Sequence, residues 1–167
     1  MNHPTSILVT GVTGFAGSCL VAKLGQIADF CVLGAHRVDQ PFADHSSTVV
    51  GDINSDTDWR SAVHGQEVVI HSAARVHVMN DTSSDPLTEF RKVNVEGTLN
   101  LAQQAAAAGV RRFIFISSIK VNGECTPSGV PYLADAQSAP ADPYGISKME
   151  AEHGLRALAA DTGRTGR

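Results

Sequence analysis

The chain has 167 residues, 43% of them hydrophobic, and a formal net charge of −4, which suits one compact domain with its own core. Its 13 lysine and arginine residues are scattered along an acidic chain, so the composition excludes the basic stripe of a nucleic-acid-binding protein. The apolar runs are shorter than the roughly 18 to 20 residues of a membrane span, and "MNHPTSILVTG" lacks the pattern of a signal peptide, so we expect a cytoplasmic protein with no membrane partner.

Short aliphatic runs alternate along the chain with longer segments of helical pattern. Most of these runs are almost continuously apolar, as in strands buried on both faces of a parallel sheet. Strands are predicted at 6–10, 30–35, 47–51, 67–73 and 111–118, and helices at 15–26, 56–64, 87–108 and 143–161. This alternation predicts an α/β fold with a Rossmann-type, doubly wound parallel sheet over residues 1–167.

Three glycines, Gly11, Gly14 and Gly17, lie directly between the strand at 6–10 and the helix at 15–26. The first glycine of such a loop permits a tight turn, the second lets the backbone approach a pyrophosphate, and the third lets helix and strand pack closely. The helix N-terminus adds free N–H groups and partial positive charge. The GxxGxxG spacing in this context therefore predicts a dinucleotide-binding site rather than a turn that only reverses the chain.

The residues after the second strand bear on the choice between NAD and NADP. An acidic residue there binds the ribose hydroxyls of NAD, and a basic one suits the 2′-phosphate of NADP. In "GAHRVDQ", His36 and Arg37 come first and Asp39 lies further on, which favours NADP but also fits a solvated surface arginine. Asp52 and Ile53 of "GDI" either lie beside the adenine or form a turn, so their role and the choice of cofactor stay open.

A tyrosine and a lysine lie four residues apart in "DPYGISKMEAE", and positions i and i+4 share one face of a helix. Asp142 is a suitable N-cap and Pro143 fits the first turn, so Tyr144 and Lys148 begin the last helix together. A phenol has a reference pKa of about 10, and lowering it to about 7 needs roughly 4 kcal/mol of differential stabilisation. A nearby ammonium favours the phenolate, and Ser118 at a strand end is a candidate hydrogen-bond donor to the reacting oxygen.

Cysteine and histidine spacing argues against metal chemistry. Cys19, Cys31 and Cys125 form no CxxC pair, so neither a disulfide framework nor a zinc site is predicted, and we expect them to be small buried or half-buried residues. The seven histidines form no HxxxH or HxH pair, and we predict no metal. His71 ends an apolar strand and is interpreted as a hydrogen-bonded core histidine.

Six motifs occur in an order and spacing that resemble the extended short-chain dehydrogenase/reductases: "TGVTGFAG", "GDI", "HSAA", "VNVEGT", "FIFISSIKVNG" and "YGISK". The resemblance points to the NAD-dependent epimerase/dehydratase family, which includes the UDP-glucose (UDP-galactose) 4-epimerases. It implies an enzyme in which a hydride leaves C4 of a hexose for the dinucleotide and returns to the other face of the keto sugar.

The resemblance also implies a Ser-Tyr-Lys triad. Tyr144 would be the general acid/base, and Lys148 would bind the nicotinamide ribose and favour the phenolate. Ser118 would complete the triad, and Ser117 is the less suitable choice.

Further residues are implied as contacts of the dinucleotide, NAD or NADP, and Arg37 joins them through its place after the second strand. They are Gly11, Gly14, Phe15, Ala16 and Gly17 at the pyrophosphate, Asp52 and Ile53 at the adenine, Ala73 and Ala74 at the ribose and phosphates, Asn94 as support for the helix that carries the site, and Tyr144 and Lys148 at the nicotinamide ribose.

Members of the resembling family are longer than this chain and bind the nucleotide sugar with a C-terminal domain. The resemblance therefore implies that residues 1–167 are the dinucleotide-binding domain and that the substrate-binding domain is missing. The implied small-molecule partner is a nucleotide sugar of the UDP-hexose class, and "IKVNGE" resembles a bacterial branch associated with surface-polysaccharide sugars. A homodimer is expected through the helices at 87–108 and 143–161.

Three functions stay open at this point. The first is a nucleotide-sugar epimerase or dehydratase, of which this chain would be the cofactor half. The second is an NADP-dependent keto reductase of the same superfamily, favoured by Arg37. The third is a catalytically silent dinucleotide-binding module, favoured by the missing substrate domain.

Overall fold

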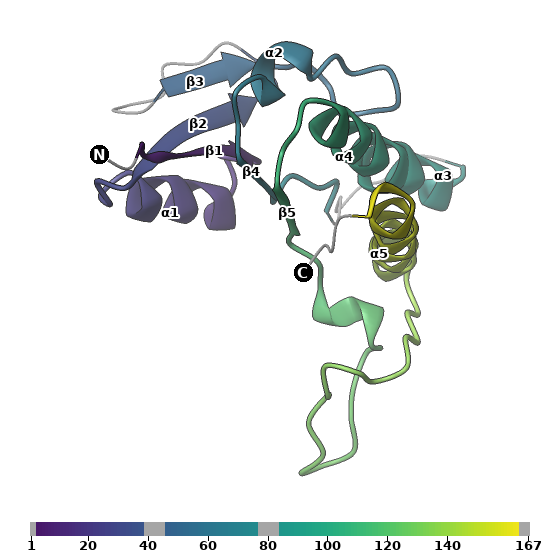
Figure 1. Ribbon diagram of the computed structural model, residues 1–167. Coiled ribbons are helices and arrows are strands. Elements are labelled where there is room, and N and C mark those ends of the chain that lie inside the picture. Colours follow the sequence, from purple (N-terminus) through teal and green to yellow (C-terminus); the bar gives the residue numbers. More distant parts are fainter. Residues whose placement is uncertain (1–2, 39–45, 77–83, 164–167) are drawn as a thin grey trace.

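The computed structural model in Figure 1 describes residues 3–38, 46–76 and 84–163. The strands are β1 (Thr5–Thr10), β2 (Phe30–His36), β3 (Ser46–Val49), β4 (Val68–His71) and β5 (Arg112–Phe115). The helices are α1 (Phe15–Leu24), α2 (Arg60–Val63), α3 (Pro86–Arg91), the π-helix η1 (Lys92–Gly97), α4 (Thr98–Ala107), the 3₁₀ helix η2 (Ile119–Val121) and α5 (Pro143–Thr162).

The five strands form one parallel sheet in the order β3-β2-β1-β4-β5. This order confirms the predicted Rossmann-type α/β fold. The strand order reverses between β1 and β4, because β2 lies on one side of β1 and β4 on the other. Doubly wound sheets bind ligands beyond the carboxyl ends of their strands, next to such a switch point.

Alternate side chains of the central strands fill two cores, one on each face of the sheet. On one face Leu8 and Val69 pack with Leu101, under α2 and α4. On the other face Val9 packs with Val21 of α1. Because successive strand residues point to opposite faces, a strand that is covered by helices on both sides must be apolar throughout. Burial on both faces of the sheet therefore explains the near-continuous apolar runs in the sequence.

The helix predicted at 56–64 is wrong at its start, because only Arg60–Val63 of that range, which form α2, are helical. The N–H of Asp56 donates to Asn54 Oδ1 at 2.8 Å, and the Thr57 hydroxyl donates to the carbonyl of Asp52 at 2.7 Å. Local hydrogen bonds from short polar side chains compete with helical ones, so this segment forms turns.

Other predicted bounds differ less. The helix predicted at 87–108 is present as α3, η1 and α4 in direct succession, with a π-helical turn that the periodicity does not reveal. Regular pairing in β4 and β5 ends at His71 and Phe115, before the ends predicted for the strands at 67–73 and 111–118.

The expectation of buried cysteines is wrong: Cys19, Cys31 and Cys125 are all exposed. Asp39 lies outside the described residues. Within the described ranges, no helix combines the length and the apolar character needed to cross a membrane.

The buried core predicts the effect of removing one side chain from α4. Leu101 is fully buried, and Leu101→Ala should lower the free energy of unfolding by about 3 kcal/mol, through lost apolar burial and a residual cavity. Leu133→Ala is the matched control, because Leu133 is 65% exposed, and should change it by less than about 0.5 kcal/mol. Urea denaturation measures both, and equal losses would contradict the assigned core.

Candidate active site

The candidate residues gather at one edge of the sheet. Strands β1, β4 and β5 are parallel neighbours, so their carboxyl ends open on the same side. The glycine loop follows β1, the "SAA" segment follows β4, and the two serines follow β5. The structure thus brings together segments that are far apart in the sequence.

The glycine loop is tightly packed by backbone contacts. Gly11 has a φ of +71°, a conformation that favours glycine, and a Cβ there would lie 2.6 Å from the backbone N of Ala73. A Cβ on Gly17 would lie 2.1 Å from the Gly11 carbonyl oxygen. The N–H of Gly14 donates to the same oxygen at 3.0 Å. Two of the three glycines are therefore required by the packing of β1, α1 and the segment after β4.

The N-terminus of α1 is open for an anion. Gly14 is the N-cap, and among the described residues no side chain caps this end of the helix. Phe15 is 90% exposed, and Ala16 is exposed too. Free N–H groups and the helix dipole favour a phosphate at such an end. The loop and helix fit the pyrophosphate of a dinucleotide.

The segment after β4 is hydrogen-bonded to the end of β1. The N–H of Ala73 donates to Thr10 Oγ1 at 3.2 Å, and the Ser72 hydroxyl donates to the Thr10 carbonyl at 2.6 Å. Ala73 and Ala74 are half-buried beside this contact. Thr10 and Ser72, which the sequence interpretation did not single out, join the two sides of the switch point.

His71 lies beneath this contact as a core histidine, as predicted. Its Nδ1 shares a hydrogen bond of 2.7 Å with Thr10 Oγ1, and its Nε2 shares one of 3.0 Å with Thr98 Oγ1. Complete burial, and secondarily the charge of Lys148, lower its pKa to about 3. The ring is therefore neutral at working pH and ties β1, β4 and α4 together.

Asn94 is buried in the π-helix η1 and binds two neighbouring segments. Its Oδ1 accepts from the N–H of Arg75 at 2.7 Å, and its Nδ2 donates to the Arg75 carbonyl at 2.9 Å. Nδ2 also donates to the hydroxyl of Ser147 in α5 at 3.0 Å. A π-helical turn frequently marks a functional position. Asn94 here connects the segment after β4 to the helix that carries Tyr144.

At the other side of the site, Arg37 and Asp52 lie opposite each other. Arg37 Nη1 and Asp52 Oδ1 are 3.5 Å apart, and both side chains are exposed. Ile53 packs against η1, where a Cβ on Gly97 would lie 2.5 Å from its Cγ2. The charge of Arg37 is thus partly balanced, which weakens the argument for a 2′-phosphate in this position.

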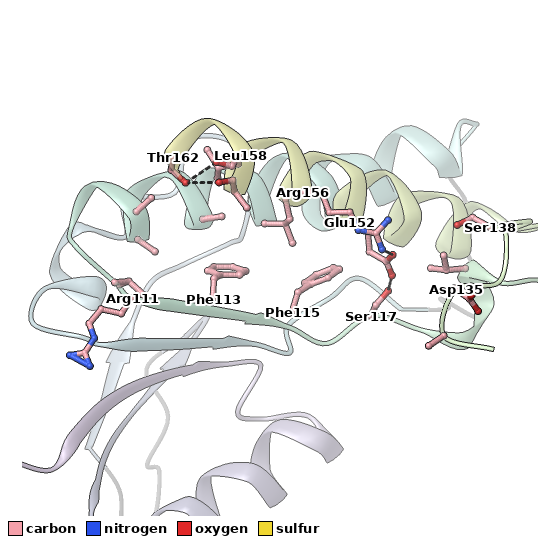
Figure 2. A pocket seen from close by; sticks show the side chains of 18 of the residues that line it. Arg111, Phe113, Phe115, Ser117, Asp135, Ser138, Glu152, Arg156, Leu158 and Thr162 are labelled. Atoms are coloured by element: carbon pink, nitrogen blue, oxygen red, sulfur yellow. Dashed lines mark hydrogen bonds and ion pairs between the residues drawn. The ribbon is translucent and has the colours of Figure 1, made fainter. Parts of the chain in front are cut away.

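The two serines after β5 point to different sides. The Ser117 hydroxyl donates to Glu152 Oε1 of α5 at 2.5 Å, as Figure 2 shows. Ser118 is the N-cap of η2, and its backbone is extended, with φ −149° and ψ 147°. Successive residues of an extended segment face opposite sides. Ser117 is thereby engaged under α5, which leaves Ser118 as the better candidate for the triad.

Tyr144 lies in the first turn of α5, which begins as predicted: Asp142 accepts from the N–H of Gly145 at 2.6 Å, and a proline occupies the first turn. The ring of Tyr144 is half-buried and packs edge-on against Phe90, with 6.1 Å between ring centroids. The guanidinium of Arg75 lies 5.5 Å from the centroid of the same Phe90 ring.

Lys148 lies one turn further along α5 and is only 1% exposed. Its Nζ is 3.8 Å from the centroid of the Phe115 ring, and Phe115 stacks on His71. Burial lowers the pKa of Lys148 to about 8, although the charge of Glu152 opposes this shift. The ammonium is thus poorly solvated and favours an anion as a neighbour.

The comparison with protein families agrees with this arrangement. Residues 7–166 match the profile described as the NAD dependent epimerase/dehydratase family. The chain belongs to this family. Among its members, the UDP-glucose 4-epimerase of Vibrio cholerae is 51% identical over 95% of the chain and 48% of its own length. The chain spans about half the length of the curated relatives it matches.

Solved structures share the fold over nearly the whole chain. A short-chain dehydrogenase/reductase superfamily protein of Agrobacterium tumefaciens with bound NAD superposes with a TM-score of 0.80 and 32% identity, covering 96% of this chain and 47% of that one. The UDP-glucose 4-epimerase of Thermotoga maritima with UDP-glucose has a TM-score of 0.79 and 27% identity, covering 97% and 53%. In both comparisons this chain corresponds to about half of a longer protein.

The buried Lys148 predicts an unusual pH dependence of stability. Its pKa in the folded chain, about 8, lies below the ordinary value of 10.5, so the unfolded chain binds more protons between these two pH values. Stability should rise with pH over this range as the penalty for burying the ammonium disappears. Lys148→Met should therefore stabilise the chain by roughly 3 kcal/mol at pH 7, and this gain should vanish towards pH 10.5.

Denaturation curves at several pH values measure this gain. Lys92→Met is the matched control, because Lys92 is exposed and paired with Glu89 at 2.6 Å, and it should leave stability and its pH dependence nearly unchanged. A loss of stability in Lys148→Met at pH 7 would contradict the burial argument.

Proposed function

We propose that the chain is the dinucleotide-binding half of a nucleotide-sugar epimerase/dehydratase of the UDP-hexose 4-epimerase type, working with NAD. One observation carries the proposal. The glycine loop at the N-terminus of α1 shares a sheet edge with the first turn of α5, where Tyr144 is followed by the buried Lys148. The UDP-glucose 4-epimerase of Vibrio cholerae, similar over this whole region, supports the substrate class.

The residues that would hold NAD follow from the packing described above. Gly14, Phe15 and Ala16 present the open N-terminus of α1 to the pyrophosphate, and Gly11 and Gly17 make the close turn beneath it. Ala73 and Ala74 border this cradle, and Arg37, Asp52 and Ile53 lie towards the adenosine end. NAD, when bound, accepts a hydride from the sugar carbon and returns it. The partial balancing of the Arg37 charge by Asp52 weakens the case for NADP, and NAD is bound in a solved relative of 32% identity.

Side chains of this chain carry out and assist the proton transfer. Tyr144 takes the proton of the reacting sugar hydroxyl onto its phenolic oxygen and later gives it back. Lys148 stabilises the phenolate, because its ammonium lies in an apolar layer with Phe115 and gains from a nearby anion. Ser118 donates a hydrogen bond to the reacting oxygen, and Asn94 supports α5 through Ser147.

The substrate-binding domain is proposed to pack beside β5. Among the described residues β5 pairs only with β4, and an open groove of about 530 Å³ lies between β5 and α5, as Figure 2 shows. Phe113, Phe115 and Leu155 are among the apolar side chains in it. Doubly wound sheets commonly continue beyond this position with a sixth parallel strand. We propose that the second half of a full-length relative supplies such a strand here.

Two further expectations stay predictions. One is a homodimer through α3, α4 and α5. The other is a role in surface-polysaccharide synthesis.

The open cradle predicts a selective loss of NAD binding. In Gly14→Ala the new Cβ would lie 3.3 Å from one carbonyl oxygen, so the fold should tolerate it, but the methyl group would occupy space next to the pyrophosphate. The dissociation constant for NAD should rise by about tenfold or more, which corresponds to roughly 1.4 kcal/mol. Calorimetric titration measures it.

Gly154→Ala is the control for that variant, since its Cβ would approach the side chain of Leu99 to 2.8 Å, where a flexible side chain can shift, in the packing of α4 on α5. It should bind NAD like the parent chain. Unchanged affinity in Gly14→Ala would place the dinucleotide elsewhere.

The acid/base assignment predicts that Tyr144→Phe strongly lowers turnover but leaves cofactor binding intact. Fused to the C-terminal half of the Vibrio cholerae UDP-glucose 4-epimerase, the chain should interconvert UDP-glucose and UDP-galactose. Tyr144→Phe should lower kcat by about 10³-fold, because the phenol provides the proton transfer, while NAD affinity stays within about twofold. Retained activity would refute the assignment.

The fusion with the unchanged chain, in the same assay, also distinguishes the epimerase from the two alternative functions, a keto reductase and a silent module. Reduction of a carbonyl substrate with exchangeable NADPH would favour the keto reductase. Binding of NAD without any turnover in the fusion would favour a silent module.

A further inference from the structure

Lys120 lies in η2, whose N-cap is Ser118, and contacts the first turn of α5, which carries Tyr144. Its Nζ is 2.9 Å and 2.8 Å from the two carboxylate oxygens of Glu124 and 2.9 Å from Asp142 Oδ2. The three N–H donors of one ammonium thus have three carboxylate acceptors, one of which belongs to the N-cap of α5.

The backbone of Lys120 contacts both elements as well. Its N–H donates to the hydroxyl oxygen of Ser118 at 3.2 Å. Its carbonyl oxygen lies against Gly145, where a Cβ would approach it to 2.7 Å. The first turn of α5 can therefore pack on η2 this closely only because residue 145 is a glycine. Through three separate groups, one residue connects the turn of Ser118 with the turn of Tyr144.

Asp142 is held from two sides. Its Oδ1 accepts from the N–H of Gly145 at 2.6 Å and caps α5, while its Oδ2 accepts from Lys120. Hydrogen bonds to Glu124, and then to Asp142, raise the pKa of Lys120 above its usual range, so the ammonium stays charged. Without this cation, two carboxylates would remain near the end of the helix that bears the phenol.

We propose that Lys120 is a positioning residue, which sets the Ser118 hydroxyl against the Tyr144 hydroxyl by tying η2 to the capped first turn of α5. The inference rests on the proposed function. It differs from a stabilising role, because the side chain of Lys120 is 40% exposed, and ion pairs of that exposure contribute little to stability. Removing the ammonium should therefore disturb the ionisation of Tyr144 far more than the stability of the fold.

The ionisation of Tyr144 can be measured without enzymatic turnover. It contains two tyrosines, Tyr132 and Tyr144, so in a Tyr132→Phe background the ultraviolet absorbance of phenolate reports Tyr144 alone. The Tyr132 hydroxyl donates to the carbonyl of Cys125, whereas the Tyr144 ring packs against Phe90. The titration is carried out on the 167-residue chain with saturating NAD.

Lys120→Met should raise the pH midpoint of the phenolate titration by about half a unit, the size expected when one hydrogen bond that stabilises the phenolate is weakened. Lys120→Arg keeps the cation and should restore the parental midpoint. Arg111→Met is the matched control: Arg111 is paired with Glu67 at 3.0 Å, beyond the opposite end of β5, and its loss should leave the midpoint unchanged. The dissociation constant for NAD should stay within about twofold in all three variants.

The variant Lys148→Met separates failure of this inference from failure of the proposed function. If Lys148→Met leaves the midpoint unchanged, the assigned acid/base pair is wrong, whatever Lys120 does. If Lys148→Met raises the midpoint and Lys120→Met does not, or if Lys120→Arg shifts it as far as Lys120→Met, the positioning role is overturned. Should Lys120→Met fail to fold, Lys120→Gln carries the same test.

Discussion

The site depends on one steric constraint, the close approach of three backbone segments at the end of β1. Gly11, Gly17 and Ala73 meet at distances that leave no room for a Cβ on either glycine. This contact lets α1 begin directly beneath the switch point of the sheet, with its N-terminal N–H groups open. A larger side chain at either position would separate α1 from the segment after β4 and remove the anion cradle.

A second constraint lies on the other side of the switch point, where polar groups are buried to position a helix. Lys148 sits in an apolar layer above Phe115, and Asn94 binds both the segment after β4 and α5. A buried, poorly solvated ammonium opposes folding, as its lowered pKa indicates. Such a placement is common at functional sites, where stability is traded for a group that gains strongly from an anionic neighbour.

The sequence predicts the structure correctly where one local rule decides the outcome. Apolar runs and glycine spacing placed β1, β2 and the start of α1, and the Asp142 cap placed the start of α5. The helix predicted at 56–64 is wrong at its start, because Asn54 Oδ1 accepts from the N–H of Asp56 and the Thr57 hydroxyl donates to the Asp52 carbonyl, and no periodicity signals these bonds. The π-helical turn at η1 is likewise not signalled by any periodicity, and its buried Asn94 binds the backbone of Arg75, a partner distant in the sequence.

By itself, the sequence determined the α/β class, the glycine loop between β1 and α1, and the placement of Tyr144 and Lys148 one turn apart in α5, because each is set by residues close together in the chain. The tertiary structure alone decided that Ser117 is engaged by Glu152 while Ser118 is left beside η2, and that Lys120 joins that turn to the cap of α5. It also decided that Arg37 faces Asp52. Apart from the local contact of Lys120 with Ser118, these contacts connect residues 15 to 35 positions apart, and the sequence pattern does not show which of them the fold brings within reach.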